Sequence, residues 1–183
     1  MSVISLYTGA GGLDLGLEAA GLRVSLAVEM DAKACDTLRE NRGRNWHVFE
    51  GDIHDLASPS ICERTGLAPE EPELLVGGPP CQPFSKSAYW RSGDTKRLDD
   101  PRADTLTAYL RVLRDLRPKV FLLENVHGLM FRGKDEGLRL LRDTINAINA
   151  AEGTAYSFAV QKLNAADYGV PQTRERVFIV GER

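Results

Sequence analysis

Apolar residues along this chain form short runs that alternate with stretches of helical spacing, and glycine and proline separate them. Short apolar or alternating runs predict strands, and apolar residues three and four apart predict helices. Because side chains alternate along a strand, Val24, Leu26 and Val28 are expected on one face of the second strand. Strands are expected over residues 3–7, 23–29, 46–50, 73–76, 120–123, 155–163 and 176–180, and helices over residues 13–20, 32–40, 58–66, 104–116 and 137–151.

The alternation of strands and helices predicts an α/β fold with a doubly wound, mostly parallel, seven-stranded sheet. One domain over residues 1–183 is expected, because neither a linker nor an internal repeat interrupts the pattern. Only a loop separates the last two predicted strands, so we expect a hairpin with one antiparallel strand there. Asp31 precedes the second predicted helix and is expected to cap it.

The composition fits one globular domain with a hydrophobic core, because the 183 residues are 43% hydrophobic and 27% charged. The net charge of −3 gives no overall basic surface for nucleic acid. Residues 86–102 differ, since they contain five basic side chains against three acidic ones. A polyanion is therefore expected to approach this segment, steered by the local charge.

The three cysteines, Cys35, Cys62 and Cys81, are widely spaced and match neither a disulfide framework nor a zinc-binding pattern, so no metal is expected. Cys35 and Cys62 fall in predicted helices and are expected to be buried as small hydrophobic residues. The sequence shows no signal peptide and no apolar run long enough to span a membrane. These features predict a cytoplasmic protein.

A strand, a glycine turn and a helix open the chain, with Gly9, Gly11 and Gly12 in the turn. Such a turn lets a ligand approach the backbone, and the helix offers free N–H groups to it. Glu29 ends the second predicted strand 20 residues after Gly9, where a carboxylate can hold the two hydroxyls of a ribose. Asp52 follows the third strand and can accept the amino group of an adenine. The pattern predicts an adenosine cofactor, and a structural turn with capping acids is the alternative.

Asp14 stands where the dinucleotide-binding fingerprint has its third glycine. A carboxylate at the start of a helix would repel a pyrophosphate. It tolerates a cofactor without pyrophosphate, such as S-adenosylmethionine, whose sulfonium is positively charged.

Cys81 ends a rigid turn, residues 77–80, that follows the fourth predicted strand, and Glu124 follows the fifth. If these strands are neighbours, the thiol and the carboxylate face one crevice beside the cofactor. A thiolate attacks an electron-poor carbon, and a carboxyl group opposite it can protonate the ring under attack. The alternatives are a buried inert thiol for Cys81 and a helix-capping or surface acid for Glu124.

Arg174 and Arg176 precede the last predicted strand, and alternation puts them on the same side. Two guanidinium groups at this spacing can bind a carbonyl, a phosphate or a carboxylate. A solvated charged turn is the alternative.

Taken in order, these motifs resemble those of the DNA (cytosine-5) methyltransferases. The resemblance spans nearly the whole chain, and two of its motifs, the cysteine loop and Glu124-Asn125-Val126, are highly specific. The matching segments are Tyr7-Thr8-Gly9-Ala10-Gly11-Gly12 with Tyr7 in the usual Phe place, Glu29-Met30-Asp31, Gly51-Asp52-Ile53, Gly78-Pro79-Pro80-Cys81-Gln82-Pro83-Phe84-Ser85, Asp104-Thr105-Leu106, Glu124-Asn125-Val126 and Gln172-x-Arg174-x-Arg176.

The resemblance implies the Rossmann-like fold of S-adenosylmethionine-dependent methyltransferases, with S-adenosylmethionine as the cofactor. By the family pattern, the residues expected to bind the cofactor are Tyr7, Gly9, Ala10, Gly11, Gly12, Glu29, Met30, Asp52, Ile53, Pro79 and Leu106. Those expected to bind the substrate are Gln82, Ser85, Asn125 and Val126. The catalytic residues expected are Cys81, Glu124, Arg174 and Arg176.

The resemblance also implies a mechanism. The target cytosine is flipped out of duplex DNA, because its carbon 5 and carbon 6 cannot be reached within the stack. Cys81 adds to carbon 6, and Glu124 holds or protonates the ring nitrogen. Carbon 5 then takes the methyl group, and loss of its proton releases Cys81. Arg174 and Arg176 support the cytosine carbonyl, the nucleophile and Glu124.

The family pattern continues after the last strand with a target-recognition domain and further cofactor-side motifs, and the sequence stops at Arg183. We therefore expect a fragment or one subunit of a split enzyme, with a second polypeptide for recognition and weak methylation by this chain alone. The alternatives are an RNA cytosine-5 methyltransferase and a non-catalytic, cofactor-binding partner of another methyltransferase. The resemblance further implies a prokaryotic, nucleoid-associated protein of a restriction–modification system.

Overall fold

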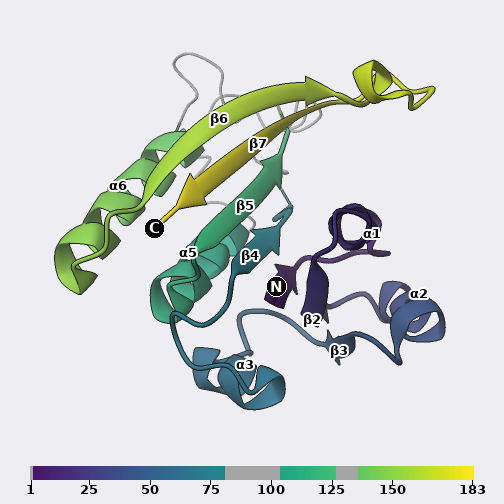
Figure 1. The fold of residues 1–183 in the computed structure, drawn as a ribbon, viewed down its shortest axis with the longest axis horizontal. Coiled ribbons are helices and arrows are strands. Elements are labelled where there is room, and N and C mark those ends of the chain that lie inside the picture. The colour runs from purple at the N-terminus through teal and green to yellow at the C-terminus, as the bar shows by residue number, and fades with distance from the viewer. Residues whose placement is uncertain (1, 81–103, 127–135) are drawn as a thin grey trace.

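A seven-stranded sheet forms the centre of the computed structural model, which describes residues 2–80, 104–126 and 136–183 (Figure 1). Its order is β3-β2-β1-β4-β5-β7-β6, and only the pairs β5–β7 and β7–β6 are antiparallel. The expected mostly parallel sheet with one antiparallel strand is thus confirmed. The strands are β1 (Ser2–Leu6), β2 (Arg23–Glu29), β3 (His47–Glu50), β4 (Leu74–Gly77), β5 (Val120–Asn125), β6 (Ser157–Asn164) and β7 (Glu175–Glu182).

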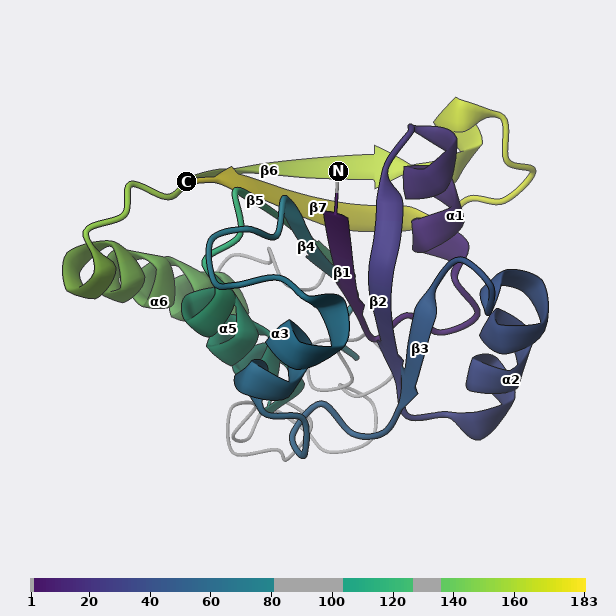
Figure 2. The same ribbon diagram turned by 60° about the horizontal axis from the view of Figure 1, so that its bottom comes forward.

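Helices cover both faces of the sheet, as a doubly wound fold requires (Figure 2). On one face, α3 (Ser58–Thr65), α5 (Asp104–Leu116) and α6 (Glu136–Glu152) bury the larger hydrophobic cluster. On the other face, α1 (Gly12–Ala19) and α2 (Ala32–Arg42) cover a smaller cluster over β1, β2 and β4. None of the helices in the described part of the chain is both long and apolar enough to cross a membrane.

The strand order reverses between β1 and β4. The chain builds β1, β2 and β3 outward in one direction and then returns to place β4 on the other side of β1. In open α/β sheets, a ligand-binding crevice forms at the carboxyl ends of the strands at such a switch point. The topology therefore directs attention to the loops that follow β1 and β4.

The helices expected over residues 104–116 and 137–151 form as α5 and α6, and most of their apolar residues at helical spacing are buried. In α5, Tyr109 and Leu113 are fully buried and Leu106, Leu110 and Leu116 nearly so. In α6, the side chains of Leu141, Ile145 and Ile148 pack into the same cluster. Asp31 also caps α2 as expected, since its carboxylate accepts a hydrogen bond from the Ala34 amide at 2.8 Å.

The expected single apolar face of β2 is wrong at one residue. Leu26 and Val28 pack into the larger cluster, whereas Val24 packs into the smaller cluster on the opposite face. The pairing register with β1 shifts here, because Val3 pairs with Val24 but Ile4 pairs with Leu26. Such an irregularity inserts one unpaired residue and breaks the alternation of side chains.

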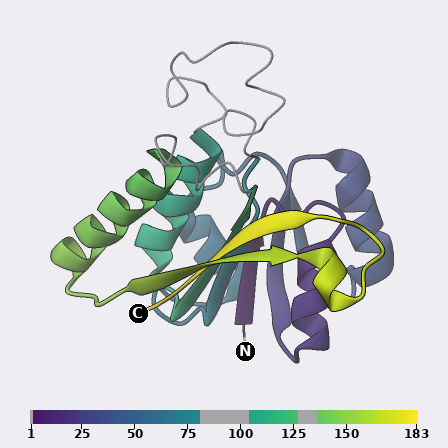
Figure 3. The same cartoon turned by 90° about the horizontal axis from the view of Figure 1, so that it is seen from above.

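The connection between β6 and β7 contains a short 3-10 helix, η4 (Ala165–Tyr168), where only a loop was expected. Asn164 stabilises it, because its side-chain oxygen accepts hydrogen bonds from the amides of Ala166 and Arg174. This connection lies on the same side of the sheet as α1 (Figure 3).

Candidate functional site

The residues expected in the site lie on the loops that follow neighbouring parallel strands. Asp52 follows β3, Glu29 ends β2, the glycine loop follows β1, Pro79 follows β4, and Glu124 lies near the end of β5. Parallel strands bring these five ends to one edge of the sheet. Strand order therefore joins segments that are far apart in the sequence, with β4 directly beside both β1 and β5 as the sequence analysis required.

The glycine loop is a tight turn that leads from β1 into α1. The Thr8 amide donates to the Val28 carbonyl at 3.2 Å, and the Gly11 amide donates to the Thr8 carbonyl at 3.0 Å. Gly11 is the N-cap of α1 in the left-handed conformation, with φ of 85°, and no side chain caps the helix. The N-cap residue therefore supplies no side-chain acceptor for the first amides of α1.

Gly11 also fits against the hydrophobic core behind the loop. A Cβ atom at this position would lie 2.9 Å from a methyl group of Leu38 and 3.3 Å from the ring of Trp46. Trp46 is fixed in turn, because its indole N–H donates to Glu18 at 2.7 Å. Glycine is needed here both for its positive φ and for this close approach.

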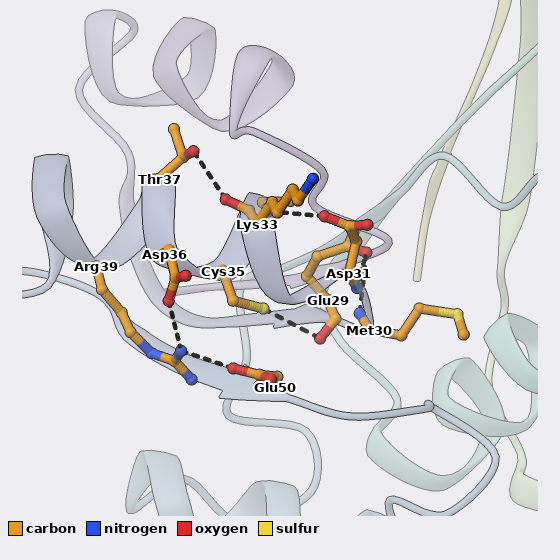
Figure 4. Close-up of polar contacts among 10 residues, drawn as sticks. Glu29, Met30, Asp31, Lys33, Cys35, Asp36, Thr37, Arg39 and Glu50 are labelled. Carbon is orange, nitrogen blue, oxygen red and sulfur yellow. Dashed lines mark hydrogen bonds and ion pairs between the residues drawn. The ribbon is translucent and has the colours of Figure 1, made fainter.

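Glu29 holds the glycine loop against the start of α2. One carboxylate oxygen accepts a hydrogen bond from the Gly9 amide at 2.7 Å, and the other accepts from the Met30 and Asp31 amides, both at 2.9 Å. Figure 4 shows this carboxylate beside Met30, a residue that is 67% exposed. The buried Cys35 thiol donates to the Glu29 carbonyl, and burial raises its pKa, which agrees with an inert role.

The segment after β3 lies next to α5. Ile53 and Leu106 are both nearly fully buried in the larger cluster, and Asp52 is half-buried. The Asp52 carboxylate accepts a hydrogen bond from the His54 amide at 2.9 Å. Cys62, on the neighbouring helix α3, is only partly buried.

A pocket of about 560 Å³ opens between α1 and the β6–β7 connection. It brings together Tyr7, Thr8 and Gly12 of the glycine loop, the end of β4, Glu124 and both arginines of the candidate catalytic set. Among the described site residues, Gly9, Ala10, Gly11, Glu29, Met30, Asp52, Ile53, Pro79, Leu106, Asn125 and Val126 do not line it. The lining residues are Ser5, Leu6, Tyr7, Thr8, Gly12, Leu13, Asp14, Gly77, Gly78, Glu124, Leu163, Ala165, Tyr168, Val170, Arg174, Arg176 and Phe178.

Glu124 and Arg176 form an ion pair within this pocket. The Arg176 Nε lies 3.1 Å from Glu124 Oε1, and the two side chains are 26% and 23% exposed. The other Glu124 oxygen lies close to Gly78, where an added Cβ would be 3.3 Å from it. The carboxylate thus sits between an arginine on β7 and the turn that follows β4.

Arg174 lies just before β7 and is exposed, and it lines the same pocket as Arg176. Its backbone is anchored, because the Arg174 amide donates to Asn164 and its carbonyl accepts from the Ala165 amide. Asn125 is buried, and its side-chain oxygen accepts a hydrogen bond from the Val126 amide at 2.7 Å.

The nucleophile candidate Cys81 lies outside the described residues, as do Gln82 and Ser85. The turn that leads to Cys81 is described as far as Pro80. Gly77 packs tightly here, because a Cβ on it would lie 2.9 Å from the Tyr109 ring. The Glu124 carboxylate therefore lies beside Gly78, a residue three positions before Cys81 in the sequence.

Sequence reasoning missed several residues of the pocket. Phe178, Tyr168 and Val170 line it from the β6–β7 connection and β7, and Tyr168 is 69% exposed. None of them falls in a motif identified from the sequence. Alternation from Arg174 and Arg176 along β7 could have placed Phe178 on the same face.

The polar groups at this edge, both donors and acceptors, fit an adenosyl cofactor that ends in an amino acid. The loop supplies the uncapped α1 amides, and β2 supplies a carboxylate fixed in orientation by three backbone N–H groups. Within the described ranges, the side chains of His, Cys, Asp and Glu form no group of three or more that could hold a metal ion.

The model of the family described as C-5 cytosine-specific DNA methylase matches residues 1–183. This chain belongs to that family. Type II methyltransferase M.AquIA of Picosynechococcus is 43% identical to this chain, over 99% of this chain and 71% of the relative. Type II methyltransferase M.SacI of Streptomyces achromogenes is 38% identical, over 100% of this chain and 48% of the relative. Apart from M.AquIA, the chain spans about half the length, or less, of the relatives described.

Solved structures share the fold of this chain. A protein described as a DNA modification methyltransferase encoded within a prophage of E. coli matches with a TM-score of 0.78 and 34% identity, over 100% of this chain and 47% of that one. The S. pombe Dnmt2 methyltransferase matches with a TM-score of 0.73 at 22% identity, over 100% of this chain and 50% of that one, which bears on the fold alone.

Proposed function

We propose that residues 1–183 form the catalytic part of an enzyme that transfers a methyl group from S-adenosylmethionine to carbon 5 of cytosine in duplex DNA. The observation that carries the proposal is the Glu124–Arg176 pair, which shares one pocket with Tyr7, Thr8 and Gly12 of the glycine loop and lies beside the turn before Cys81. The relatives, named Type II methyltransferases, support both the reaction and a place in a restriction–modification system.

The cofactor would be held along the carboxyl edge of the sheet. Glu29 would accept the ribose hydroxyls with Met30 beside it, and Asp52, Ile53 and Leu106 would surround the adenine. The loop of Tyr7, Gly9, Ala10, Gly11 and Gly12, with Pro79 opposite, would enclose the amino acid end. S-adenosylmethionine supplies an electrophilic methyl group, which carbon 5 takes as the sulfonium becomes a thioether.

The chain's own residues would prepare the cytosine for this transfer. The Cys81 thiolate forms a bond to carbon 6 of the flipped base. The electron pair of the carbon 5–carbon 6 double bond shifts towards the ring nitrogen between the carbonyl and the amino group. Glu124 donates a proton to the ring nitrogen and so stabilises the charge that develops there. After methylation, a base removes the proton from carbon 5, the double bond re-forms, and the thiolate leaves.

The remaining pocket residues would orient the base. Arg176 would hold the Glu124 carboxyl group in place, and Arg174, which lines the same pocket, would bind the cytosine carbonyl through its guanidinium. Asn125 and Val126 shape the base pocket, and Gln82 and Ser85 contact DNA after Cys81. We propose that recognition of the DNA sequence comes from protein outside residues 1–183, in the same or a second polypeptide, because most relatives are about twice as long.

Trapping on DNA that contains 5-fluorocytosine tests this function, because fluorine at carbon 5 cannot leave as a proton does. With S-adenosylmethionine present, the chain should form a covalent adduct detectable by mass spectrometry. Cys81→Ala should abolish the adduct and Glu124→Gln should slow it by roughly 100-fold, in the range of a general acid. Cys62→Ala is the matched control and should leave the rate unchanged.

The same assay separates the alternatives. Adduct formation on fluorinated RNA but not on duplex DNA would identify an RNA enzyme. Binding of S-adenosylhomocysteine without any adduct would identify a non-catalytic partner. An adduct that persists in Cys81→Ala would overturn the assignment of the nucleophile.

A further inference from the structure

Thr105, in the first turn of α5, contacts two segments that are remote from it in the sequence. Its backbone carbonyl accepts a hydrogen bond from the Tyr7 hydroxyl at 2.7 Å. Its own hydroxyl donates to the Pro80 carbonyl at 3.2 Å. One residue thus joins the loop that would hold the cofactor to the residue bonded directly to Cys81.

The rings of Pro79 and Pro80 stiffen the turn before Cys81, and Thr105 adds a polar contact at its end. Pro79 and Pro80 have no N–H groups, so the second half of the turn can donate no backbone hydrogen bonds. Packing of Gly77 against the Tyr109 ring fixes the start of the turn. The Thr105 hydroxyl contacts its end, three residues later.

The element that carries Thr105 is rigid. Leu106, Tyr109 and Leu113 on the same helix are at least 96% buried, and the Tyr109 hydroxyl lies 3.3 Å from the carbonyls of both Leu75 and Leu122. A side chain on such a helix can hold a partner to within a narrow range of positions.

Tyr7 is equally constrained. It follows β1 in the left-handed backbone conformation, with φ of 56°, and its side chain lines the pocket and packs against the larger hydrophobic cluster. A non-glycine residue holds this conformation only where its surroundings over-determine it. The hydrogen bond from its hydroxyl to α5 is one such constraint.

We propose that Thr105 is a positioning residue for the turn that presents Cys81, and that the Tyr7 hydroxyl ties this turn to the cofactor loop. The inference rests on the proposed function, since it takes Cys81 as the nucleophile and the glycine loop as the cofactor site. It assigns the two side-chain hydroxyls a role in catalysis that involves no contact with either substrate.

The test compares Thr105→Val, which removes the hydroxyl at constant shape, with Thr105→Ser, which restores it. Alkylation of Cys81 by iodoacetamide, followed by mass spectrometry in the presence of S-adenosylhomocysteine, measures how the thiol is presented without requiring turnover. Loss of one hydrogen bond should slow this alkylation by roughly threefold to tenfold in Thr105→Val and in Tyr7→Phe. Thr105→Ser should restore most of the rate.

Controls separate positioning from general damage. Thr107→Val makes the same substitution on the exposed side of the same helix and should change nothing. Alkylation of Cys35 and Cys62 should be the same in every variant, and the affinity for S-adenosylhomocysteine should change less than twofold in Thr105→Val. In the double variant Tyr7→Phe with Thr105→Val, the loss should be smaller than the product of the two single losses.

Two results would overturn the inference. One is equal alkylation of Cys81 in Thr105→Val and Thr107→Val, and the other is a Thr105→Val defect that appears only as weaker cofactor binding. The proposed function fails in a different way, through the absence of a Cys81-dependent adduct on fluorinated DNA in the wild-type chain.

Discussion

Asp14 shows how a single buried charge bears on both stability and the site. Its side chain is 1% exposed, and its Oδ1 atom has no hydrogen-bond partner in the part of the chain that the structure describes. Burial raises the pKa of this carboxyl above its ordinary value of 3.8, and the nearby Ser5 hydroxyl offsets the shift only in part. A carboxylate near the start of α1 would gain about 0.5 kcal/mol from the helix dipole. Burial of an unpaired polar group costs about 1–3 kcal/mol, which exceeds the gain from the helix dipole. The net effect of the Asp14 carboxylate on the stability of the folded state is therefore unfavourable.

We therefore predict that Asp14→Asn raises the free energy of unfolding of the ligand-free chain at pH 7 by about 1 kcal/mol. A group whose pKa is raised on folding favours the folded state at low pH and opposes it once ionised. The advantage of the variant should thus shrink as the pH falls towards 3.8. Urea unfolding at several pH values measures it. Asp36→Asn, at a site 78% exposed, is the control, and a less stable Asp14→Asn at pH 7 would show that the carboxylate is paired.

At the level of elements, α5 holds the segment between β3 and α3 through hydrogen bonds. Its Arg111 guanidinium donates to the carbonyls of Ile53 at 2.7 Å and Leu56 at 3.1 Å. It also lies 3.4 Å from the Ser58 hydroxyl, which donates to Asp115 on the same helix. Arg111 therefore holds the segment that begins at Asp52 and Ile53, the proposed adenine contacts.

Replacing Arg111 with Met should preserve the apolar stem and remove these hydrogen bonds. We expect the affinity for S-adenosylhomocysteine, measured by calorimetry, to fall roughly tenfold, because hydrogen bonds from charged groups contribute about 1.5–3 kcal/mol. Arg114→Met, on the exposed side of the same helix, should alter the affinity less than twofold. Equal affinities in the two variants would show that the segment after β3 keeps its shape without Arg111.

The same elements show what the sequence determines locally. The apolar stripes of α5 and α6 follow from spacing alone, and both helices form as predicted. The opposite facing of Val24 and Leu26 did not follow, because a register shift against β1 depends on pairing between strands. Similarly, β5 runs two residues beyond its predicted end, since antiparallel pairing with β7 extends the ladder to Asn125.

For the site, sequence motifs identified the groups with distinctive chemistry and missed those defined by their neighbours. Glu124 and Arg176 were marked by their motifs, and the sheet order then placed them in contact. Thr105 belonged to a motif, but its hydroxyl bond to Pro80 depends on how α5 lies against β4. Phe178 and Tyr168 entered the pocket only through the folding of the β6–β7 connection.

Across the whole molecule, the carboxyl edge and the amino edge of the sheet have different roles. The carboxyl edge holds every candidate site residue that the structure describes. The amino edge holds an ionic cluster in which Glu70 pairs with Arg117 at 3.2 Å and Arg183 at 2.8 Å, and Arg117 also pairs with Glu152 at 3.0 Å. This cluster connects the segment before β4, the end of α5, the end of α6 and the end of β7.

The separation of the edges predicts that stability can be changed at the amino edge without any effect on cofactor binding. Hydrogen bonds from Arg117 and Arg183 lower the pKa of Glu70 below its ordinary value of 4.5. A group whose pKa is lowered on folding stabilises the protein above its unfolded-state pKa, and this stability is lost as the pH falls through the folded-state value. Glu70→Gln should therefore lower the thermal midpoint at pH 7 slightly, because exposed ion pairs contribute little. The difference should vanish at acidic pH, while the affinity for S-adenosylhomocysteine at pH 7 stays at the wild-type value.

Glu63→Gln, on the exposed side of α3, controls for the loss of one negative charge. Weaker cofactor binding in Glu70→Gln would show that the two edges of the sheet are coupled through the strands. An equal loss of stability at pH 3 and pH 7 would show that Glu70 acts through its shape and not through its charge.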